Sequence, residues 1–519
     1  MHYAGTKPVD LFQFEVEALI AGKSQRTTLG VLDFRSFYFP PGVNFEGAVF
    51  SEYACFIGVA FPGPVSFCGA RFAKDGNFTQ ATFYGCNFGS AMFEENVVFA
   101  RATFNRSEAN FIEAIFKQKA NFEEARFEAV TTFGGAEFGE AIFKSADFHS
   151  RVSFGNSRFG SLADFGTAAF RVQADFNNAS FEAGNFTFTR FCGGASFFRA
   201  TFHGTASFDW AEFSELAEFG HAAFDGRASF ERAKFGSARF GAARFQLGAT
   251  FDGATFSGEA EFQLSTFGSD STGNKVVADF SDVQFEKPTR VWFTQVNKGS
   301  KGGLRARFLN CDVEHVNLED VRWHRRRSGR MVLQDELDIL EGGREKERTV
   351  DAGAGHSEYE LVAIAYRKLI NNFDNVRALD LAEDCFCGAM EMKRRDPKES
   401  LSSRAVLSVY KLASSYGSNY VQALLVLLGI VLVTGFVFAI PWLELGPARG
   451  NPGAVQMASS WLRRCPAGLF HSLQVATFQR DAVYAFTLRR GRLIVIAEQV
   501  LVPIQAALLL LAVRRRFRR

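Results

Sequence analysis

The sequence of 519 residues predicts a mainly β solenoid, followed by a helical hairpin and two transmembrane α-helices. Three observations lead to this fold class. Phenylalanine occurs 61 times, phenylalanines recur every five or six residues through the first half of the chain, and two long apolar segments lie near the C-terminus. One residue type used so often indicates one structural position used many times, so a repeat is expected.

The repeat begins at Phe34 and runs to Phe267 with these two spacings, apart from one seven-residue step before Phe111. Alanine stands two positions before many of the phenylalanines, as in Ala195–Phe197, and polar residues fill the intervening positions. A helix requires apolar residues three and four apart, and an alternating strand requires a period of two, so neither fits. A solenoid does fit, because each short unit forms one side of a coil with one large and one small side chain inward.

Segments 120–127 (ANFEEARF) and 228–235 (ASFERAKF) resemble the pentapeptide-repeat family. The resemblance implies a right-handed quadrilateral β-helix with four pentapeptides per coil. The alternation of five and six departs from strict pentapeptides and predicts a one-residue bulge at some corners. With about 21 to 22 residues per coil, an array that continues to Trp323 gives roughly 13 coils and a rod on the order of 60 Å.

The phenylalanines of the array are predicted to face inward, where each contributes ~1.5–3 kcal/mol from burial. A stacking platform for single-stranded nucleic acid would instead require exposed aromatic rings beside a basic groove, so we expect no nucleic-acid partner. The inward positions that we single out are Phe122, Phe127, Phe197, Phe202, Phe208, Phe213, Phe219, Phe224, Phe230 and Phe235.

The rest of the chain divides by composition. A charged stretch without periodicity separates the array from a hairpin whose first helix opens with a capping-box spacing, Ser357 to Glu360. In chain order we expect an N-terminal lead-in or cap (1–30), the solenoid (31–323), a charged linker (324–356), a helical hairpin (357–396), an interfacial helix (401–419), a first transmembrane helix (420–440), an extracytoplasmic loop (441–492) with a short pore-helix-like segment (466–478), a second transmembrane helix (493–513) and a basic tail (514–519).

Residues 421–440 contain no charged side chain and are long enough to cross a bilayer, whereas Glu498, Gln499, Pro503 and Gln505 interrupt the second span. Basic residues precede the first span and follow the second, which favours a hairpin with both of these flanks in the cytoplasm. Arginines 489, 490 and 492, between the spans, argue against this topology. We therefore expect a multi-pass protein of the bacterial inner (cytoplasmic) membrane with the solenoid in the cytoplasm. The first ten residues lack a signal peptide's apolar region.

The order span, short helix, span resembles the pore module of two-helix potassium-type channels and the C-terminal region of some pentapeptide-repeat membrane proteins. The channel filter would fall near Thr477, but the sequence there, Thr-Phe-Gln-Arg-Asp up to Asp481, has no glycine. A selective potassium filter is therefore not expected, because glycine supplies the backbone angles that it needs. Thr477, Asp481, Glu498 and Gln499 are the candidate pore-like or interface residues, and Glu498 could line an oligomeric interface or pair with Arg492.

No catalytic motif, cofactor site or metal site stands in the sequence, and Cys385 and Cys387 read as ordinary buried thiols. The net charge of +2 argues against DNA mimicry of the kind that regulates a topoisomerase, which remains the weakest alternative. The favoured function is a non-catalytic, membrane-anchored scaffold for a protein partner that the sequence does not identify. The other alternative is an ion-channel-like or mechanosensing homo-oligomer formed through the transmembrane helices, with the solenoid as its cytoplasmic regulatory domain.

Overall fold

The computed structural model describes residues 32–35, 39–268, 276–298, 303–341, 356–440, 443, 445–447, 461–479, 484–486 and 489–517. The predicted N-terminal lead-in or cap (1–30) lies outside these residues. The chain forms two compact units. The first contains Met1–Arg348 and Asn371–Arg377, and the second contains Thr349–Ile370 and Ala378–Arg519.

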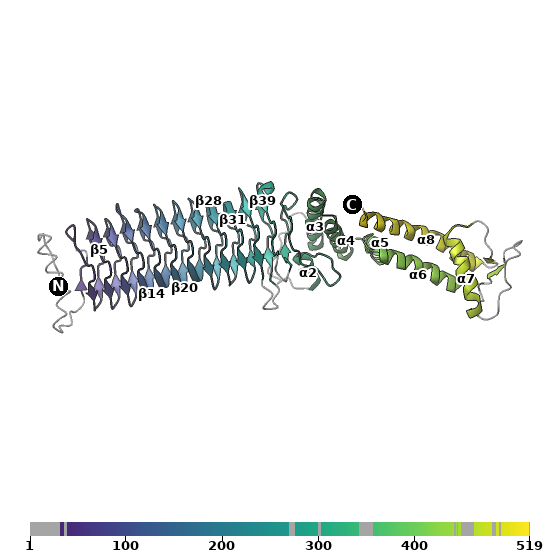
Figure 1. Cartoon of the computed structure of the whole chain (residues 1–519), viewed down its shortest axis with the longest axis horizontal. Coiled ribbons are helices and arrows are strands. Elements are labelled where there is room, and N and C mark those ends of the chain that lie inside the picture. The colour runs from purple at the N-terminus through teal and green to yellow at the C-terminus, as the bar shows by residue number, and fades with distance from the viewer. Residues whose placement is uncertain are drawn as a thin grey trace. The chain divides into compact units, whose positions relative to one another are not determined.

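The first unit is a β-solenoid, with about 10 turns between residues 49 and 267. Four ladders of parallel strands form the sides of the coils, and Figure 1 shows these strands stacked in rows. One ladder joins thirteen segments: β1 (Leu32–Asp33), β3 (Ala54–Cys55), β7 (Gly76–Asn77), β11 (Val97–Val98), β14 (Ile115–Asn121), β17 (Glu137–Ile142), β20 (Arg158–Asp164), β23 (Ser180–Asn185), β27 (Ala206–Ser207), β30 (Ala228–Ser229), β33 (Ala249–Thr250), β37 (Ala278–Asp279) and β40 (Ala306–Arg307).

The neighbouring ladder shares β14, β17, β20 and β23 and adds β2 (Val49–Phe50), β6 (Arg71–Phe72), β10 (Met92–Phe93), β26 (Thr201–Phe202), β29 (Ala223–Phe224), β32 (Arg244–Phe245) and β36 (Thr266–Phe267). The third contains β4 (Ala60–Phe61), β8 (Thr82–Phe83), β12 (Thr103–Phe104), β15 (Arg126–Phe127), β18 (Asp147–Phe148), β21 (Ala169–Phe170), β24 (Arg190–Phe191), β28 (Glu212–Glu218), β31 (Lys234–Arg239), β34 (Thr255–Phe256) and β38 (Gln284–Phe285). The fourth shares β28 and β31 and adds β5 (Val65–Ser66), β9 (Cys86–Asn87), β13 (Ala109–Asn110), β16 (Thr131–Thr132), β19 (Val152–Ser153), β22 (Ala174–Asp175), β25 (Ala195–Ser196), β35 (Ala260–Glu261) and β39 (Val291–Trp292), which follows a short 3₁₀ turn, η2 (Pro288–Arg290).

The core of the solenoid is a set of phenylalanine columns. Register places phenylalanine over phenylalanine in successive coils, so that the ring centroids of Phe197 and Phe219 lie 4.9 Å apart and those of Phe208 and Phe230 lie 5.0 Å apart. The rings of both pairs are nearly parallel. All ten of the inward phenylalanines singled out from the sequence are at most 2% exposed. The pleat directs the polar neighbours outward, which produces the observed alternation of buried and exposed residues.

The five- and six-residue spacings have a structural cause. Coils of unequal length pair in register except at corners, where one strand carries an extra residue, as between Phe116 and Lys119 in β14. Other corners hold non-glycine residues in the left-handed region, including Trp210 at φ 58°. That conformation costs an L-residue roughly 1–2 kcal/mol. Backbone hydrogen bonds between coils, such as Trp210 N–H to the Glu231 carbonyl at 2.8 Å, oppose the cost.

The open C-terminal end of the solenoid is covered. Helix α2 (Gln334–Glu341) follows the buried residues Met331, Val332 and Leu333. Residues 324–341, predicted to form the first part of a charged linker, are therefore packed structure, because the last coil requires an apolar cover and partners for its backbone groups. Residues 342–355 of that linker lie outside the described residues.

Side chains complete the hydrogen bonds of the last coil. The Phe308 backbone N–H, which has no further strand to pair with, donates to Asp335 of α2 at 2.9 Å. The Asn372 amide nitrogen donates to the carbonyls of Val313 and Val316, at 2.7 Å each. The Trp323 ring meets the Phe373 ring edge-on, with centroids 6.1 Å apart. The last coil is therefore capped by specific polar and aromatic contacts.

The second unit is helical. It contains α3 (Glu358–Asn375, whose last turn belongs to the first unit), α4 (Leu379–Arg395), α5 (Leu401–Ser414), α6 (Tyr420–Phe438), α7 (Trp461–Ala476) and α8 (Arg489–Arg516), with an antiparallel pair of strands, β41 (Leu445–Pro447) and β42 (Tyr484–Phe486). At the predicted capping box, the Glu360 backbone N–H donates to Ser357 Oγ at 3.0 Å.

Helix α7 differs from the predicted segment 466–478, because it begins at Trp461 and contains Pro466. A proline one turn inside a helix removes a single intrahelical hydrogen bond near an end that is already short of partners, so the helix continues through it.

Candidate functional sites

Helices α6 and α8 are long and apolar enough to cross a membrane, and they are the two such helices within the described residues. Only 17% of the most apolar window of each is buried inside the chain, whereas the core helix of a soluble protein would be mostly buried. Their exposed side chains include Leu424, Leu425, Leu428, Leu432, Val433, Phe436, Leu493, Ile496, Val500, Leu501, Ile504 and Leu510. By length and composition these two helices could cross a membrane, and most of their apolar surface is not buried within the chain.

A polar cluster joins α6, α7 and α8. The Glu498 side chain of α8 is fully buried, and its Oε1 accepts hydrogen bonds from Thr434 of α6, at 2.8 Å, and from Ser472 of α7. The Ser472 hydroxyl also lies 2.8 Å from the Val431 carbonyl oxygen. Glu498 Oε2 has no hydrogen-bond partner among the described residues. The carboxyl group thus lies between three helices of one chain.

The other candidate pore-like residues do not gather around Glu498. Gln499 is exposed on α8. The Thr477 hydroxyl donates to the Leu473 carbonyl one turn earlier in α7, at 2.8 Å, which is an ordinary way for threonine to end a helix. Asp481 lies outside the described residues. Among the described residues, Glu498 therefore belongs to a buried polar cluster with Thr434 and Ser472 that includes neither Thr477 nor Gln499.

Helices α6 and α7 approach closely at two glycines. A Cβ atom on Gly468 would lie 2.3 Å from the Gly435 carbonyl oxygen, and one on Gly435 would lie 2.8 Å from Leu469 Cα. Real side chains do not tolerate such distances, so the crossing requires glycine on both helices. The close approach is what places Ser472 of α7 within reach of Thr434 and Glu498, at 2.9 Å from the Thr434 hydroxyl.

Glu391 of α4 is the centre of a second cluster, here called the Glu391 clasp. Its buried carboxylate accepts hydrogen bonds from Arg394 (2.8 Å), Arg395 (2.6 Å), Lys411 of α5 (3.1 Å) and the Tyr416 hydroxyl (2.8 Å). Burial alone would raise the pKa of the Glu391 carboxyl, but the hydrogen bonds from these cationic and phenolic donors lower the pKa well below its usual range. The Glu391 clasp fastens α4 to α5 and to the turn that leads into α6.

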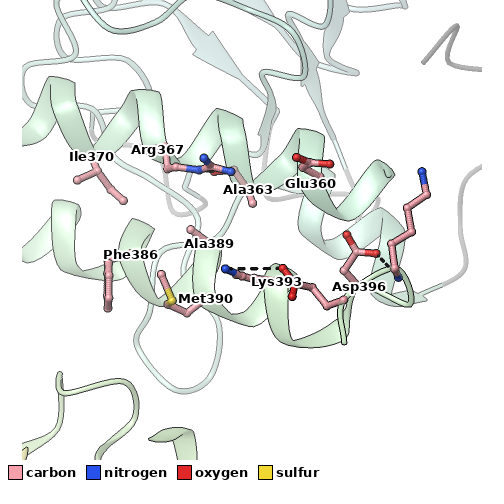
Figure 2. Close-up of a pocket in the computed structure, with 11 residues that line it drawn as sticks. Glu360, Ala363, Arg367, Ile370, Phe386, Ala389, Met390, Lys393 and Asp396 are labelled. Carbon is pink, nitrogen blue, oxygen red and sulfur yellow. Dashed lines mark hydrogen bonds and ion pairs between the residues drawn. The ribbon is translucent and has the colours of Figure 1, made fainter. Parts of the chain in front are cut away.

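A groove of about 680 Å³ runs along α3 and α4, and Figure 2 shows Glu360, Ala363, Arg367 and Ile370 on one side of it and Phe386, Ala389, Met390 and Lys393 on the other. Several of its charged groups have partners: Lys393 lies 3.6 Å from Glu399, Glu360 pairs with His356 at 2.8 Å, and Asp396 accepts a hydrogen bond from the Lys398 backbone N–H. No group of three or more potential metal ligands occurs among the described residues. We find no nucleophile–base pair in the groove.

Two aromatic clusters lie on the outer wall of the solenoid. At one corner the Phe188 and Trp210 rings stack with centroids 5.8 Å apart, and the Arg232 guanidinium lies 4.9 Å from the centre of the Trp210 ring. Phe188 is 53% exposed and Trp210 42% exposed. At another corner Arg199 lies over Phe198, which meets His221 edge-on. The phenylalanines of the repeat are core residues, but Phe188 stands between Phe186 and Phe191 and falls outside the five- and six-residue spacing, which marks it as external.

A comparison of the sequence with known protein families agrees with the solenoid fold. The family model for pentapeptide repeats (9 copies) matches residues 88–137 and 111–158, a region that forms consecutive four-sided coils here. No curated protein and no solved structure matches the chain. The matched family is one of structural and interaction modules, and no catalytic family is indicated. The matched repeats, the phenylalanine columns and the parallel ladders show that residues 49–267 form a pentapeptide-repeat β-solenoid.

Proposed function

We propose that the protein is a non-catalytic scaffold that α6 and α8 hold in the bacterial inner membrane and whose solenoid presents a rigid outer wall to a protein partner. The observation that carries the proposal is the contrast between the two parts of the chain. The solenoid buries its large apolar side chains within its own coil, whereas α6 and α8 leave most of theirs exposed. A lipid bilayer is the surrounding that satisfies such helices.

The hairpin geometry supports a multi-pass topology. Helices α6 and α8 pack against each other and against α7 within one unit. The Arg515 side chain at the end of α8 donates to the Tyr416 carbonyl at 3.1 Å, so the end of α8 returns to the level of the turn that follows α5. With both basic flanks on one side, the solenoid would lie in the cytoplasm.

The outer wall offers a specific place for a partner. Trp and Arg are enriched among the side chains that contribute most to protein interfaces, and Phe is enriched in interfaces relative to the rest of the surface. Phe188, Trp210 and Arg232 form the stacked cluster described above at one corner. The same turn position in other coils holds residues such as Arg101, Glu124 and Thr167. The corner with Trp210 is therefore the position at which a protein partner is expected to make its main contact.

Site-specific crosslinking in intact membranes tests the scaffold. A photoreactive residue in place of Trp210 should crosslink one protein reproducibly, and the crosslink should be lost when Arg232 and Phe188 are changed to serine. The matched control replaces Arg101, which lies at the same turn position on a distant coil. Equal crosslinking from positions 101 and 210, or none from 210, would contradict the proposed surface.

The buried polar cluster keeps an ion-channel-like function as the second candidate, because polar groups inside spanning helices often mark ion pathways. The cluster favours a structural role, since Glu498 is enclosed by its own chain and bonded to Ser472 and Thr434. Ion flux through purified protein in liposomes distinguishes the two. Ion flux that disappears in the Glu498→Gln variant would support the channel function and contradict the scaffold function. A folded protein that conducts no ions would support the scaffold function.

A further inference from the structure

The end of the membrane hairpin that carries α5 combines an exposed apolar helix face with a dense group of basic residues. We propose that α5 and the C-terminal end of α8 form a binding belt for anionic phospholipid headgroups. The proposal rests on the membrane anchoring proposed above and names the lipid class. The belt consists of Arg404 and Lys411 of α5 and Arg514, Arg515 and Arg516 of α8.

Helix α5 is fastened at the end of the two spans by side chains that reach its last carbonyl groups. The Gln422 amide of α6 donates to the carbonyls of Lys411 and Leu412, at 3.0 and 2.7 Å. The Gln505 amide of α8 donates to the Ala413 carbonyl. Arg515, which follows the apolar segment of α8, donates to the Tyr416 carbonyl just after α5 at 3.1 Å, and Gln422 lies in the first turn of α6. The last turn of α5 therefore lies beside the ends of both spans, where they leave the hydrocarbon at the level of the lipid headgroups.

The free face of α5 is apolar. Leu401, Val406, Val409 and Leu412 are 82%, 68%, 65% and 73% exposed. In a helix with 3.6 residues per turn these positions share one broad side, and Arg404 and Lys411, seven residues apart, lie together at its edge. An apolar face bordered by basic residues is the arrangement by which helices lie in the interface of an anionic membrane.

Positive charge is concentrated near α5 and at the end of α8, although the net charge of the whole chain is close to zero. Residues 391–419 contain six basic and three acidic side chains, and residues 514–519 contain five basic and no acidic ones, a net charge of +8 against +2 for the whole chain. Basic groups next to a membrane surface contribute about 1 kcal/mol each when the lipid is anionic. The charge therefore favours an anionic lipid over a zwitterionic one.

Two of the arginines are available for a phosphate group. Neither Arg404 nor Arg514 forms an ion pair among the described residues, and Arg514 is exposed. The remaining members of the belt are partly engaged. Lys411 belongs to the Glu391 clasp, Arg515 donates to the Tyr416 carbonyl at 3.1 Å, and Arg516 lies 3.4 Å from Asp380 in an exposed pair. Arg404 and Arg514 are therefore the residues to test.

The full chain in a neutral detergent is titrated with phosphatidylglycerol and, separately, with phosphatidylcholine, and bound lipids are counted by native mass spectrometry. The wild-type chain should bind phosphatidylglycerol at least about tenfold more tightly. The double variant Arg404→Gln, Arg514→Gln should weaken phosphatidylglycerol binding about thirty-fold and leave phosphatidylcholine binding unchanged, as expected for two charges near a headgroup. Val409→Asp, on the exposed face of α5, should weaken phosphatidylglycerol binding without unfolding the chain.

The matched control is Arg489→Gln, Arg490→Gln, which removes two exposed arginines from the opposite end of α8. It should change phosphatidylglycerol affinity by less than about twofold. Equal binding of the two lipids, an equal loss in the control, or no effect of Val409→Asp would overturn the belt. Extraction of membranes with alkaline carbonate distinguishes the failure of the membrane anchor from the failure of the lipid-binding belt. A chain that is released from the membrane contradicts anchoring by α6 and α8. A chain that stays in the membrane but shows no preference for phosphatidylglycerol contradicts only the belt.

Discussion

At the scale of the residue, the direction of one side chain decides what a phenylalanine does in this protein. Phe208 is fully buried and stacks with Phe186 and Phe230, with centroids 4.7 and 5.0 Å away, whereas Phe188 lies on the outer wall. Sequence spacing distinguishes the two, because Phe208 obeys the repeat and Phe188 does not. What spacing could not reveal is the stack of Phe188 with Trp210, because it joins residues 22 positions apart at a corner whose pairing depends on the bulges.

This difference can be measured with one substitution at two positions. Phe208→Ala should destabilise the solenoid by about 3–5 kcal/mol, because it removes a ring from a close-packed column and leaves a cavity. Phe188→Ala should cost less than about 1 kcal/mol, because the side chain is already half in water. Hydrogen exchange in the flanking coils and the thermal midpoint report both effects. Similar losses of protection in the two variants would mean that the columns are not the core.

The Glu391 clasp predicts a pH dependence. The folded state holds the pKa of Glu391 below its unfolded value of about 4.3, so the stabilisation is complete above that pH and is lost as the pH falls from about 4 toward the folded pKa. Glu391→Gln should cost about 1–3 kcal/mol at neutral pH, since its partners are partly exposed, and should reduce the loss of stability in acid. The thermal unfolding midpoint of the helical unit, recorded as a function of pH for the wild-type chain and the variant, measures both effects.

The control for the Glu391 clasp is Glu399→Gln, which weakens a looser pair with Lys393 at 3.6 Å. It should change the unfolding midpoint little at any pH. A pH profile of Glu391→Gln that parallels the wild-type profile would show that another carboxyl group dominates the acid response.

At the scale of the element, apolar length predicted α6 and α8, and the repeat predicted the strands. Three features were beyond prediction. The start of α7 at Trp461 depends on a tolerated proline, and the use of residues 324–341 as a cover depends on the needs of the last coil. The third is the contact of α6 with α7, which depends on Gly435 and Gly468 facing each other across 33 positions of sequence.

The glycine crossing gives a prediction for the packing of α6 against α7. Gly468→Ala should push α7 away from α6 and cost about 1–3 kcal/mol, because its Cβ would lie 2.3 Å from the Gly435 carbonyl oxygen. Gly429→Ala in α6 should be neutral or slightly stabilising, because no atom lies within 4 Å of the added Cβ. Thermal unfolding in detergent compares the variants. A Gly468→Ala variant whose thermal midpoint equals that of the wild-type chain would show that the helices do not cross at these glycines.

At the scale of the whole molecule, the chain combines two solutions to the burial of apolar surface. The solenoid encloses its phenylalanines and covers its last coil with α2 and the end of α3, whereas the hairpin of α6 and α8 leaves apolar side chains exposed. The fold class was predictable because a long repeat of phenylalanine every five or six residues and two long apolar segments are strong signals. The binding surfaces were not, because they depend on which side chains of distant coils and helices meet.

The most direct test of the account is the partition of the protein between membrane and aqueous fractions after alkaline carbonate extraction. The full chain should remain in the membrane pellet, and a chain that ends at Ser400, without α5 to α8, should enter the supernatant as a soluble solenoid with its β-structure intact. A full chain that is released into the supernatant, or a shortened chain that remains in the pellet, would contradict the claim that an enclosed phenylalanine core is carried on a membrane hairpin.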